Sequence, residues 1–131
     1  MKILGIGNAI VDVISKVEDD FLTKNGLTKS GMELIFDEKK FKDLLSNLKI
    51  EKTVSGGSVA NSIVGLSQLG NKVGFIGKVC DDDFGTKYEE GLKKENVEYF
   101  YSKKKEELPT GTCLVLITPD SERTMCTFLG T

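Results

Sequence analysis

Val54-Ser55-Gly56-Gly57-Ser58-Val59-Ala60-Asn61-Ser62-Ile63-Val64-Gly65-Leu66-Ser67-Gln68-Leu69-Gly70 is the stretch around which this sequence is organised. Although 29% of the 131 residues are charged, none of the residues from Thr53 to Asn71 is. Apolar and small residues recur here at spacings of three and four, which predicts a helix that is apolar over most of its circumference and surrounded by other protein. Gly70 is expected to end this helix.

The start of the predicted helix carries residue types that suit a small polar ligand. Gly56 and Gly57 allow the backbone to approach a ligand closely or to adopt a positive φ. Ser58 is a good N-cap residue, and Asn61 places a donor and an acceptor on the first turn. A hydroxyl-bearing ligand fits this surface, but a strand-to-helix turn with two structural glycines explains the same residues, and both interpretations stay open.

Length and composition predict one modest domain with a core, since 39% of the residues are apolar. The net charge of -2 gives no basic surface for nucleic acid, and the one basic run, residues 103–105, is followed at once by two glutamates. No apolar run is long enough to span a membrane. Cys80, Cys113 and Cys126 lack metal-binding spacing and are expected to be reduced thiols of a cytoplasmic protein.

Carboxylates are the expected proton handlers, because the chain has no histidine and therefore no His-based triad. Asp12 is a lone carboxylate in an apolar run, where burial is costly without hydrogen bonds. It either caps a turn or accepts hydrogen bonds from ligand hydroxyls. The acidic run at residues 81–83 precedes a helical pattern of Phe84, Tyr88 and Leu92, which favours helix capping, and no metal site is predicted. Asp37 is likewise expected to cap the helix whose pattern follows it.

The remaining pattern predicts a parallel α/β core. Strands are expected at residues 51–54 and 72–79, on either side of the central helix, and this order indicates a βαβ unit with parallel pairing. Two extended excursions, at about residues 11–36 and 97–118, interrupt the core. Residues 112–118 and 123–128 are expected to form a hairpin.

Four motifs lie in order along the chain: G-x-G-N-A-x-V-D at residues 5–12, G-G-S-V-A-N at 56–61, F-I-G-K-V-x-D-D-x-F-G at 75–85 and E-R-T-M at 122–125. Together they resemble the N-terminal half of the PfkB (ribokinase-like) carbohydrate kinases, over essentially all 131 residues. The first and last motifs are most similar to the adenosine-kinase-like branch. The resemblance implies a ribokinase-like α/β fold, in which flanking helices cover a parallel sheet core and residues 11–36 and 97–118 form a small β-structured lid.

The resemblance also implies a function. Such enzymes transfer the γ-phosphoryl group of ATP, with Mg²⁺, to a primary hydroxyl of a sugar or nucleoside, and adenosine or a ribose-type sugar is the expected acceptor. The implied site residues are Asn8, Asp12, Gly56, Gly57 and Asn61 for the sugar, and Arg123 for the transferring phosphoryl group. A homodimer formed through the lid is a further expectation.

The family's D-T-x-G-A-G-D motif, which carries the catalytic base, does not occur in residues 1–131. By the resemblance, residues 1–131 are the N-terminal part of a kinase domain, incomplete relative to the family and inactive alone. Three interpretations follow: the sugar-binding part of a kinase, a free-standing sugar- or nucleoside-binding or regulatory module without catalysis, and a generic α/β domain with structural glycines.

Overall fold

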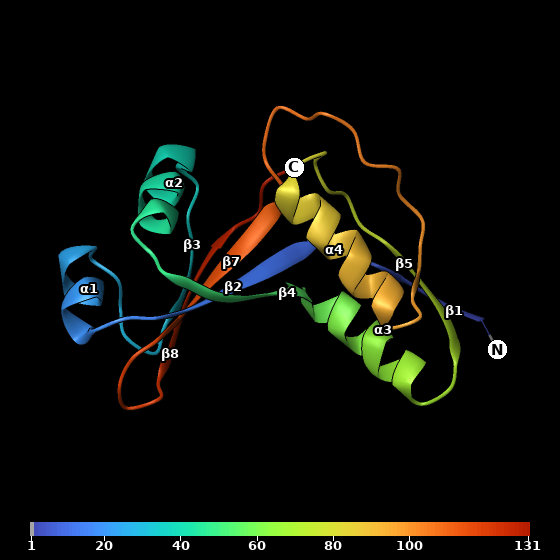
Figure 1. The fold of residues 1–131 in the computed structure, drawn as a ribbon, viewed down its shortest axis with the longest axis horizontal. Helices are drawn as coiled ribbons and strands as arrows, with labels where there is room; N and C mark the ends of the chain where they lie inside the picture. Colours follow the sequence, from blue (N-terminus) through green and yellow to red (C-terminus); the bar gives the residue numbers. More distant parts are fainter. Residues whose placement is uncertain (1) are drawn as a thin grey trace. The chain divides into compact units, whose positions relative to one another are not determined.

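A computed structural model describes residues 2–131, which form two compact units (Figure 1). The first unit contains residues 2–11, 54–111 and 130–131, and the second contains residues 12–53 and 112–129. The strands are β1 (Lys2–Ile6), β2 (Ile10–Lys16), β3 (Met32–Leu34), β4 (Ile50–Gly56), β5 (Lys72–Ile76), β6 (Glu98–Tyr99), β7 (Gly111–Ile117) and β8 (Arg123–Phe128). The helices are α1 (Asp19–Lys24), α2 (Glu38–Ser46), α3 (Ser58–Gln68) and α4 (Asp83–Lys94).

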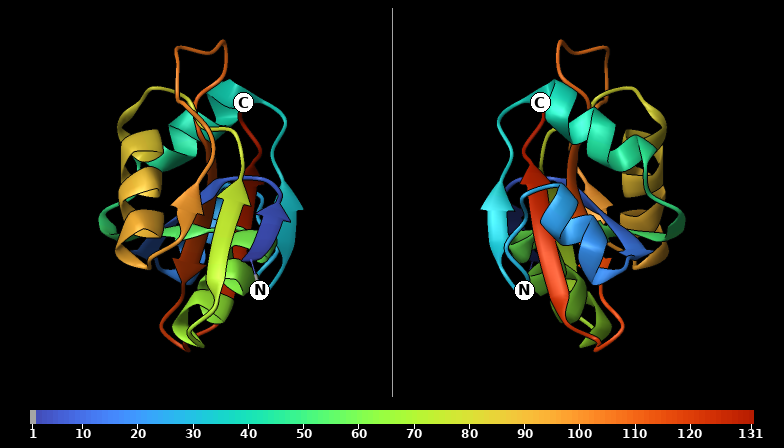
Figure 2. Two further views of the ribbon diagram at one scale, coloured as in Figure 1. Left: turned by 90° about the vertical axis from the view of Figure 1, so that its right-hand side faces the viewer. Right: turned by 90° about the vertical axis from the view of Figure 1, so that its left-hand side faces the viewer.

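The first unit is built on a three-stranded parallel sheet with the order β1-β5-β6. Figure 2, left, shows these strands side by side; α3 packs against β1 and β5, and α4 packs against β6. The covered face carries Phe75, which is fully buried with its ring centroid 6.2 Å from that of Tyr88 in α4. Leu4 and Ile6 alternate away from this face and are 53% and 70% exposed.

The predicted pairing of the strands that flank the central helix is wrong. β4 leads into α3 but belongs to the other sheet, whereas β5 follows α3 and pairs with β1. The strand-helix-strand order indicates only that the chain returns in the parallel direction, and packing then decides the partner. β4 contains Glu51 and Lys52, and these charged residues suit its place at the edge of a sheet.

The second unit is built on a five-stranded sheet with the order β3-β8-β7-β2-β4. β7 and β8 form the predicted antiparallel hairpin, and β3 runs parallel to β8. Figure 2, right, shows α1 and α2 lying over β8. Phe41 of α2 stacks on Phe128 of β8 with 5.2 Å between ring centroids, so these helices cover one face of the sheet.

The extended excursions and the second unit have different bounds. The excursions were expected at residues 11–36 and 97–118, but the second unit also includes α2 and most of β4 and begins again only at residue 112. Residues 97–111 belong to the first unit, where the period-two pattern gives the two-residue strand β6, paired with β5. Alternation indicates a strand, but it does not indicate which sheet the strand joins.

The start of α3 confirms one prediction and corrects another. Gly57 adopts the predicted positive φ, at 96°, but it is itself the N-cap residue. Ser58 is the first helical residue and makes no capping hydrogen bond, so its predicted role as N-cap is wrong. Gly70 ends the helix as predicted, with φ at 83°, and its N–H and that of Asn71 donate to carbonyls of the last turn.

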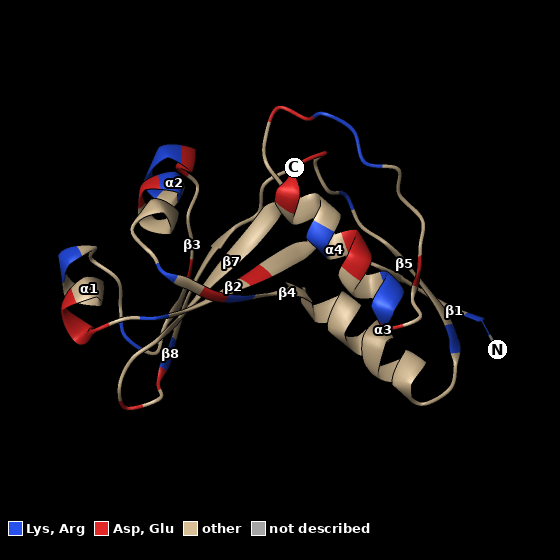
Figure 3. Cartoon of the chain, in the orientation of Figure 1, with Lys and Arg blue, Asp and Glu red and all other residues tan. Residues whose placement is uncertain are grey.

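The central helix is less covered than its composition predicts. Ala60 and Ile63 are buried, but Val59 is 38% exposed, and Leu69, just after the helix, is 79% exposed. In Figure 3, α3 carries no charge along its length, whereas α4 carries both signs. Within residues 2–131 the three-stranded sheet covers only one side of α3, so the cover expected from its composition is supplied only in part.

The capping predictions for two acidic residues are confirmed. Asp37 accepts hydrogen bonds from the N–H groups of Lys39 and Lys40 at the start of α2, at 2.8 and 3.2 Å. Asp82 accepts one from the N–H of Gly85 at the start of α4, at 2.7 Å. Both carboxylates also lie at the positive end of their helix dipole.

We expect Gly57→Ala to destabilise the chain more than Gly70→Ala. Both positions have a positive φ, so alanine is strained at either by about 1 kcal/mol or more. At Gly57 the added Cβ would also lie 2.6 Å from the carbonyl oxygen of Asn8, whereas at Gly70 it would meet no atom within 4 Å. Chemical denaturation of the two variants measures the difference, and equal losses would contradict the close approach at Gly57.

Candidate functional site

The sheet of the second unit has two chemically different faces, because side chains alternate along each strand. The face under α1 and α2 holds fully buried residues, such as Leu114 opposite Cys126. The alternate residues form what we call the second face, where Cys113 lies opposite Thr127. It carries Asp12, Met32, Leu34, Cys113, Val115, Met125 and Thr127. Met32 and Leu34 are 72% and 50% exposed, so this face is apolar and partly open.

Asp12 lies on the second face in the middle of an apolar strand. Its neighbours Val11 and Val13 are buried on the opposite face, at 1% and 0% exposure. Burial raises the pKa of the Cys113 thiol, and a hydrogen bond with Thr127 lowers it. The Asp12 carboxylate is close enough to Cys113 to raise this pKa further. Because Asp12 lies within β2 and not at a turn, the turn-capping interpretation is wrong.

Burial raises the pKa of the Asp12 carboxyl above its ordinary value of 3.8. Desolvation disfavours the charged form, and the apolar side chains around Asp12 give it little compensation. A carboxylate in this state gains free energy from any hydroxyl or N–H that donates to it. The second face therefore combines an apolar surface with one strong hydrogen-bond acceptor.

Sequence reasoning missed Cys113 as a neighbour of Asp12, and Thr127 as the residue opposite Cys113 on the same face. The hairpin pattern contains part of the signal, because alternation places Cys113 and Thr127 on one face once their register is known. The adjacency of β2 and β7 is the missing part. It joins residues about a hundred positions apart, and no local pattern indicates it.

The predicted site residues of the first unit gather at the start of α3. The backbone of Gly57 lies against the carbonyl oxygen of Asn8, and the N–H of Asn61 donates to the carbonyl of Gly57 at 2.9 Å. The side chains of Asn8 and Asn61 are exposed. Gly56 is buried, and its carbonyl accepts a hydrogen bond from the Tyr88 hydroxyl at 3.3 Å. No side chain caps this helix start, so its first N–H groups suit a ligand oxygen.

Arg123 lies at the other end of the hairpin from Thr127. It is exposed, it begins β8 opposite Ile117, and it belongs to the second face by alternation. It lies four positions along the strand from Thr127, a distance of about 13 Å along the backbone. Asp12 and Arg123 thus share a face without being direct neighbours. A hollow of about 430 Å³ lies at this end of the hairpin, lined by Lys16, Val17, Glu18, Ile117, Thr118, Pro119 and Ser121.

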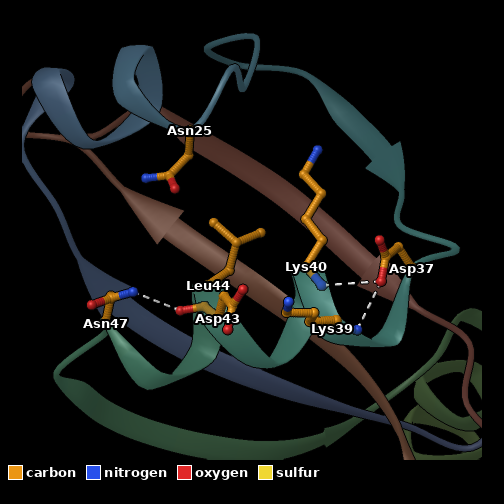
Figure 4. Close-up of a pocket in the computed structure, with 7 residues that line it drawn as sticks. All are labelled: Asn25, Asp37, Lys39, Lys40, Asp43, Leu44 and Asn47. Carbon is orange, nitrogen blue, oxygen red and sulfur yellow. Dashed lines mark hydrogen bonds between the residues drawn. The ribbon is translucent and has the colours of Figure 1, made fainter.

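Another hollow of the second unit, about 270 Å³ in volume, lies beside α2 (Figure 4). Asn25, Asp37, Lys39, Lys40, Asp43, Leu44 and Asn47 line it. Its polar groups include the Asp37 cap of α2 and the Asn47 amide, which donates to the Asp43 carbonyl at 2.7 Å. These contacts hold the two ends of α2, and the hollow lies on the helical side of the unit, so we place the candidate site elsewhere.

Two further features bear on the kind of ligand. Among residues 2–131, no three His, Cys, Asp or Glu side chains are grouped closely enough to hold a metal ion. In the same part of the chain, no helix has both the length and the apolar character needed to cross a membrane. The described groups are hydroxyls, amides, backbone N–H groups and one carboxylate, which suit an uncharged polyhydroxyl ligand.

Comparison with known proteins places this chain. The family described as "pfkB family carbohydrate kinase" matches this chain over residues 6–131. The chain belongs to this family. Its relatives include the 5-dehydro-2-deoxygluconokinase of Mesomycoplasma hyopneumoniae (strain 232), which is 32% identical over 110 residues. That match covers 84% of this chain and 31% of the relative, so the chain spans about a third of the length of the curated relatives it matches.

Solved structures of pfkB-type kinases have the same fold. A probable sugar kinase from Rhizobium etli CFN 42 superposes with a TM-score of 0.86 at 36% identity, over 99% of this chain and 39% of that one. The adenosine kinase from Sinorhizobium meliloti gives a TM-score of 0.84 at 35% identity, over 98% and 39%. The predicted ribokinase-like α/β fold is thereby confirmed.

The raised pKa of Asp12 predicts how stability depends on pH. The folded chain binds this proton more tightly than the unfolded chain, so the free energy of unfolding falls as the pH rises from 3.8 through the raised pKa. We expect Asp12→Asn to raise the melting temperature at pH 7 and to lose this advantage below pH 3.8. Thermal denaturation over a pH series measures this, with Asp20→Asn, at an exposed acid of α1, as the control. Identical melting temperatures at pH 7 would contradict the cost of the Asp12 charge.

Proposed function

We propose that this chain provides the acceptor-binding part of an ATP-dependent kinase that phosphorylates a primary hydroxyl of a sugar or nucleoside. The observation that carries the proposal is Asp12, a carboxylate in the middle of an apolar strand, beside the buried thiol of Cys113. A charge in this place destabilises the fold, and neither a salt bridge nor a helix cap accounts for it among the described contacts. We attribute it to ligand binding.

A carboxylate at this position suits a sugar for a chemical reason. Its two oxygens accept hydrogen bonds from the two hydroxyls of a vicinal diol, and the charge strengthens both bonds. Apolar side chains of the second face, such as Val115 and Met125, suit the carbon face of a sugar or a purine base. The same face therefore matches the polar and the apolar side of such an acceptor.

We propose Asn8, Gly56, Gly57 and Asn61, which belong to the first unit, and Asp12, which belongs to the second, as acceptor-binding residues. The exposed amides of Asn8 and Asn61 offer donors and acceptors, while Gly57 lets the backbone lie close to a ligand. We propose that the β-structured lid implied by the family resemblance, at about residues 11–36 and 97–118, excludes water from the transfer step. A homodimer through this lid remains part of the proposal.

ATP is the proposed phosphoryl donor, as the family description supports. Mg²⁺ is commonly held in kinases by one or two carboxylates together with the nucleotide phosphates, so it needs no all-protein cage. Arg123 is the proposed guanidinium for the transferring phosphoryl group, because planar bidentate donors match phosphate oxygens. Its exposed place at the start of β8 leaves the guanidinium accessible to a charged ligand.

Asp12→Ala should weaken acceptor binding by about 1.5–3 kcal/mol, the usual range for hydrogen bonds to a charged group. The test is calorimetry on the complete gene product with adenosine, ribose and 5-dehydro-2-deoxygluconate, combined with a phosphoryl-transfer assay using ATP. Asp20→Ala is the control, because this exposed acid belongs to α1.

The outcomes of this test separate the candidate functions. Transfer to one acceptor, lost with Asp12, supports the kinase proposal. Binding without transfer would favour the second candidate, a sugar- or nucleoside-binding module. Affinity unchanged by Asp12→Ala would remove Asp12 from the site.

Arg123→Ala should lower kcat more than it raises the acceptor KM. The guanidinium would interact mainly with charge that develops during transfer, and an interaction made only in the transition state appears in kcat. Steady-state kinetics of the complete gene product measure both constants, with Arg123→Lys as the variant that keeps the charge. An effect confined to the acceptor KM would contradict the phosphoryl role.

A further inference from the structure

Both ends of the β7–β8 hairpin are held at one point of the first unit. The segment that leads into β7 contains Pro109, and the carbonyl of Pro109 accepts a hydrogen bond from the N–H of Thr131, which follows β8, at 3.0 Å. Gly130 has φ at 67°, and a Cβ there would overlap the Pro109 carbonyl oxygen and lie 2.7 Å from the backbone nitrogen of Gly111. The incoming and outgoing segments are therefore in direct contact.

Asp82 links the segment that leads into β7 to the start of α4 by hydrogen bonds. Its Oδ2 accepts a hydrogen bond from the N–H of Thr110 at 2.9 Å, and its Oδ1 accepts one from the Thr110 hydroxyl at 2.7 Å. The Thr110 oxygen also accepts a hydrogen bond from the N–H of Cys80 at 3.0 Å. Thr110 is only 1% exposed and Asp82 is half-buried, so water reaches these contacts only from the Asp82 side.

These contacts exceed what helix capping requires. Asp37 caps α2 through two N–H groups of that helix alone. Asp82 caps α4 through the N–H of Gly85. Its carboxylate also accepts two hydrogen bonds from Thr110, which is 28 residues away in sequence. Gly85 allows this packing, because a Cβ there would overlap the carbonyl oxygen of Cys80.

We propose that Asp82, acting through Thr110, is a positioning residue for the acceptor site. By fixing both ends of the hairpin, it restricts the movement of β7, which carries Cys113, the neighbour of Asp12. Hydrogen bonds to an ionised carboxylate are about twice as strong as neutral ones, which suits a contact that restrains the hairpin ends. The consequence for catalysis rests on the proposed kinase function, whereas the restraint on the hairpin does not.

Three variants of the complete gene product distinguish the loss of the Asp82–Thr110 contact, which we call the joint, from a general loss of stability. Thr110→Val removes the hydroxyl and leaves the Asp82 cap on Gly85 in place. Thr110→Ser restores the hydroxyl. Thr124→Val is the matched control: Thr124 is also 1% exposed, and its hydroxyl accepts a hydrogen bond from the N–H of Ser30 at 3.0 Å, away from the joint.

Hydrogen exchange of backbone amides tests the restraint directly. In Thr110→Val we expect the amides at the hairpin ends, those of Thr112 and Thr131, to exchange about tenfold faster, as the loss of a hydrogen bond to a charged group implies. Thr110→Ser should stay near the wild type, and Thr124→Val should leave these amides unchanged. Equal acceleration in Thr110→Val and Thr124→Val would overturn the proposal.

Kinetics test the consequence for the site. With an acceptor that the wild type phosphorylates, Thr110→Val should raise the acceptor KM about tenfold and leave the ATP KM unchanged, and Thr110→Ser should restore both. An equal change in the two constants, or the same rise in Thr124→Val, would overturn the positioning role. If the wild type phosphorylates none of the acceptors, the kinase function fails, and the exchange comparison still decides whether the joint holds the hairpin.

Discussion

The alternation of side chains along β2 is the constraint on which the second unit depends. Val11 and Val13 are buried on one face of the sheet, and the pleat then places Asp12 on the other. A slip of one residue would exchange the faces and bury the carboxylate under the helices, where an unpaired charge is far more costly than on the partly open second face. The same strand register therefore packs the core and places the charge. Asp12 cannot move to the other face unless the core is disrupted.

Polar contacts in this chain fall into two groups with different consequences. Exposed ion pairs, such as Lys42 with Glu38 along α2, contribute little, because water and salt screen them. Buried contacts to backbone groups hold together segments that are far apart in the sequence. The Asp82 carboxylate with Thr110 is the clearest example, since it closes the ends of one hairpin and starts one helix. A few such buried contacts contribute more to the stability of the fold than the many surface charges do.

Local features were predictable from the sequence, whereas long-range pairing was not. The caps at Asp37 and Asp82 and the positive φ at Gly57 follow from residues within one turn, and the structure confirms them. The partner of β5 was predicted wrongly, because strand pairing is decided by packing across the whole chain. For the same reason Asp12 was recognised as unusual from its apolar neighbours, while the Cys113 thiol beside it was missed.

The pKa of Asp12 with and without an acceptor tests the central claim most directly. Carbon-13 NMR titration of the side-chain carboxyl measures it in the free protein and with a saturating neutral acceptor, adenosine first. The account predicts a pKa above the ordinary 3.8 in the free protein, because of burial, and a lower value in the complex, because ligand hydroxyls donate to the charged form. An ordinary pKa in the free protein, or a raised pKa that bound acceptor leaves unchanged, would contradict the claim that Asp12 is kept for the ligand.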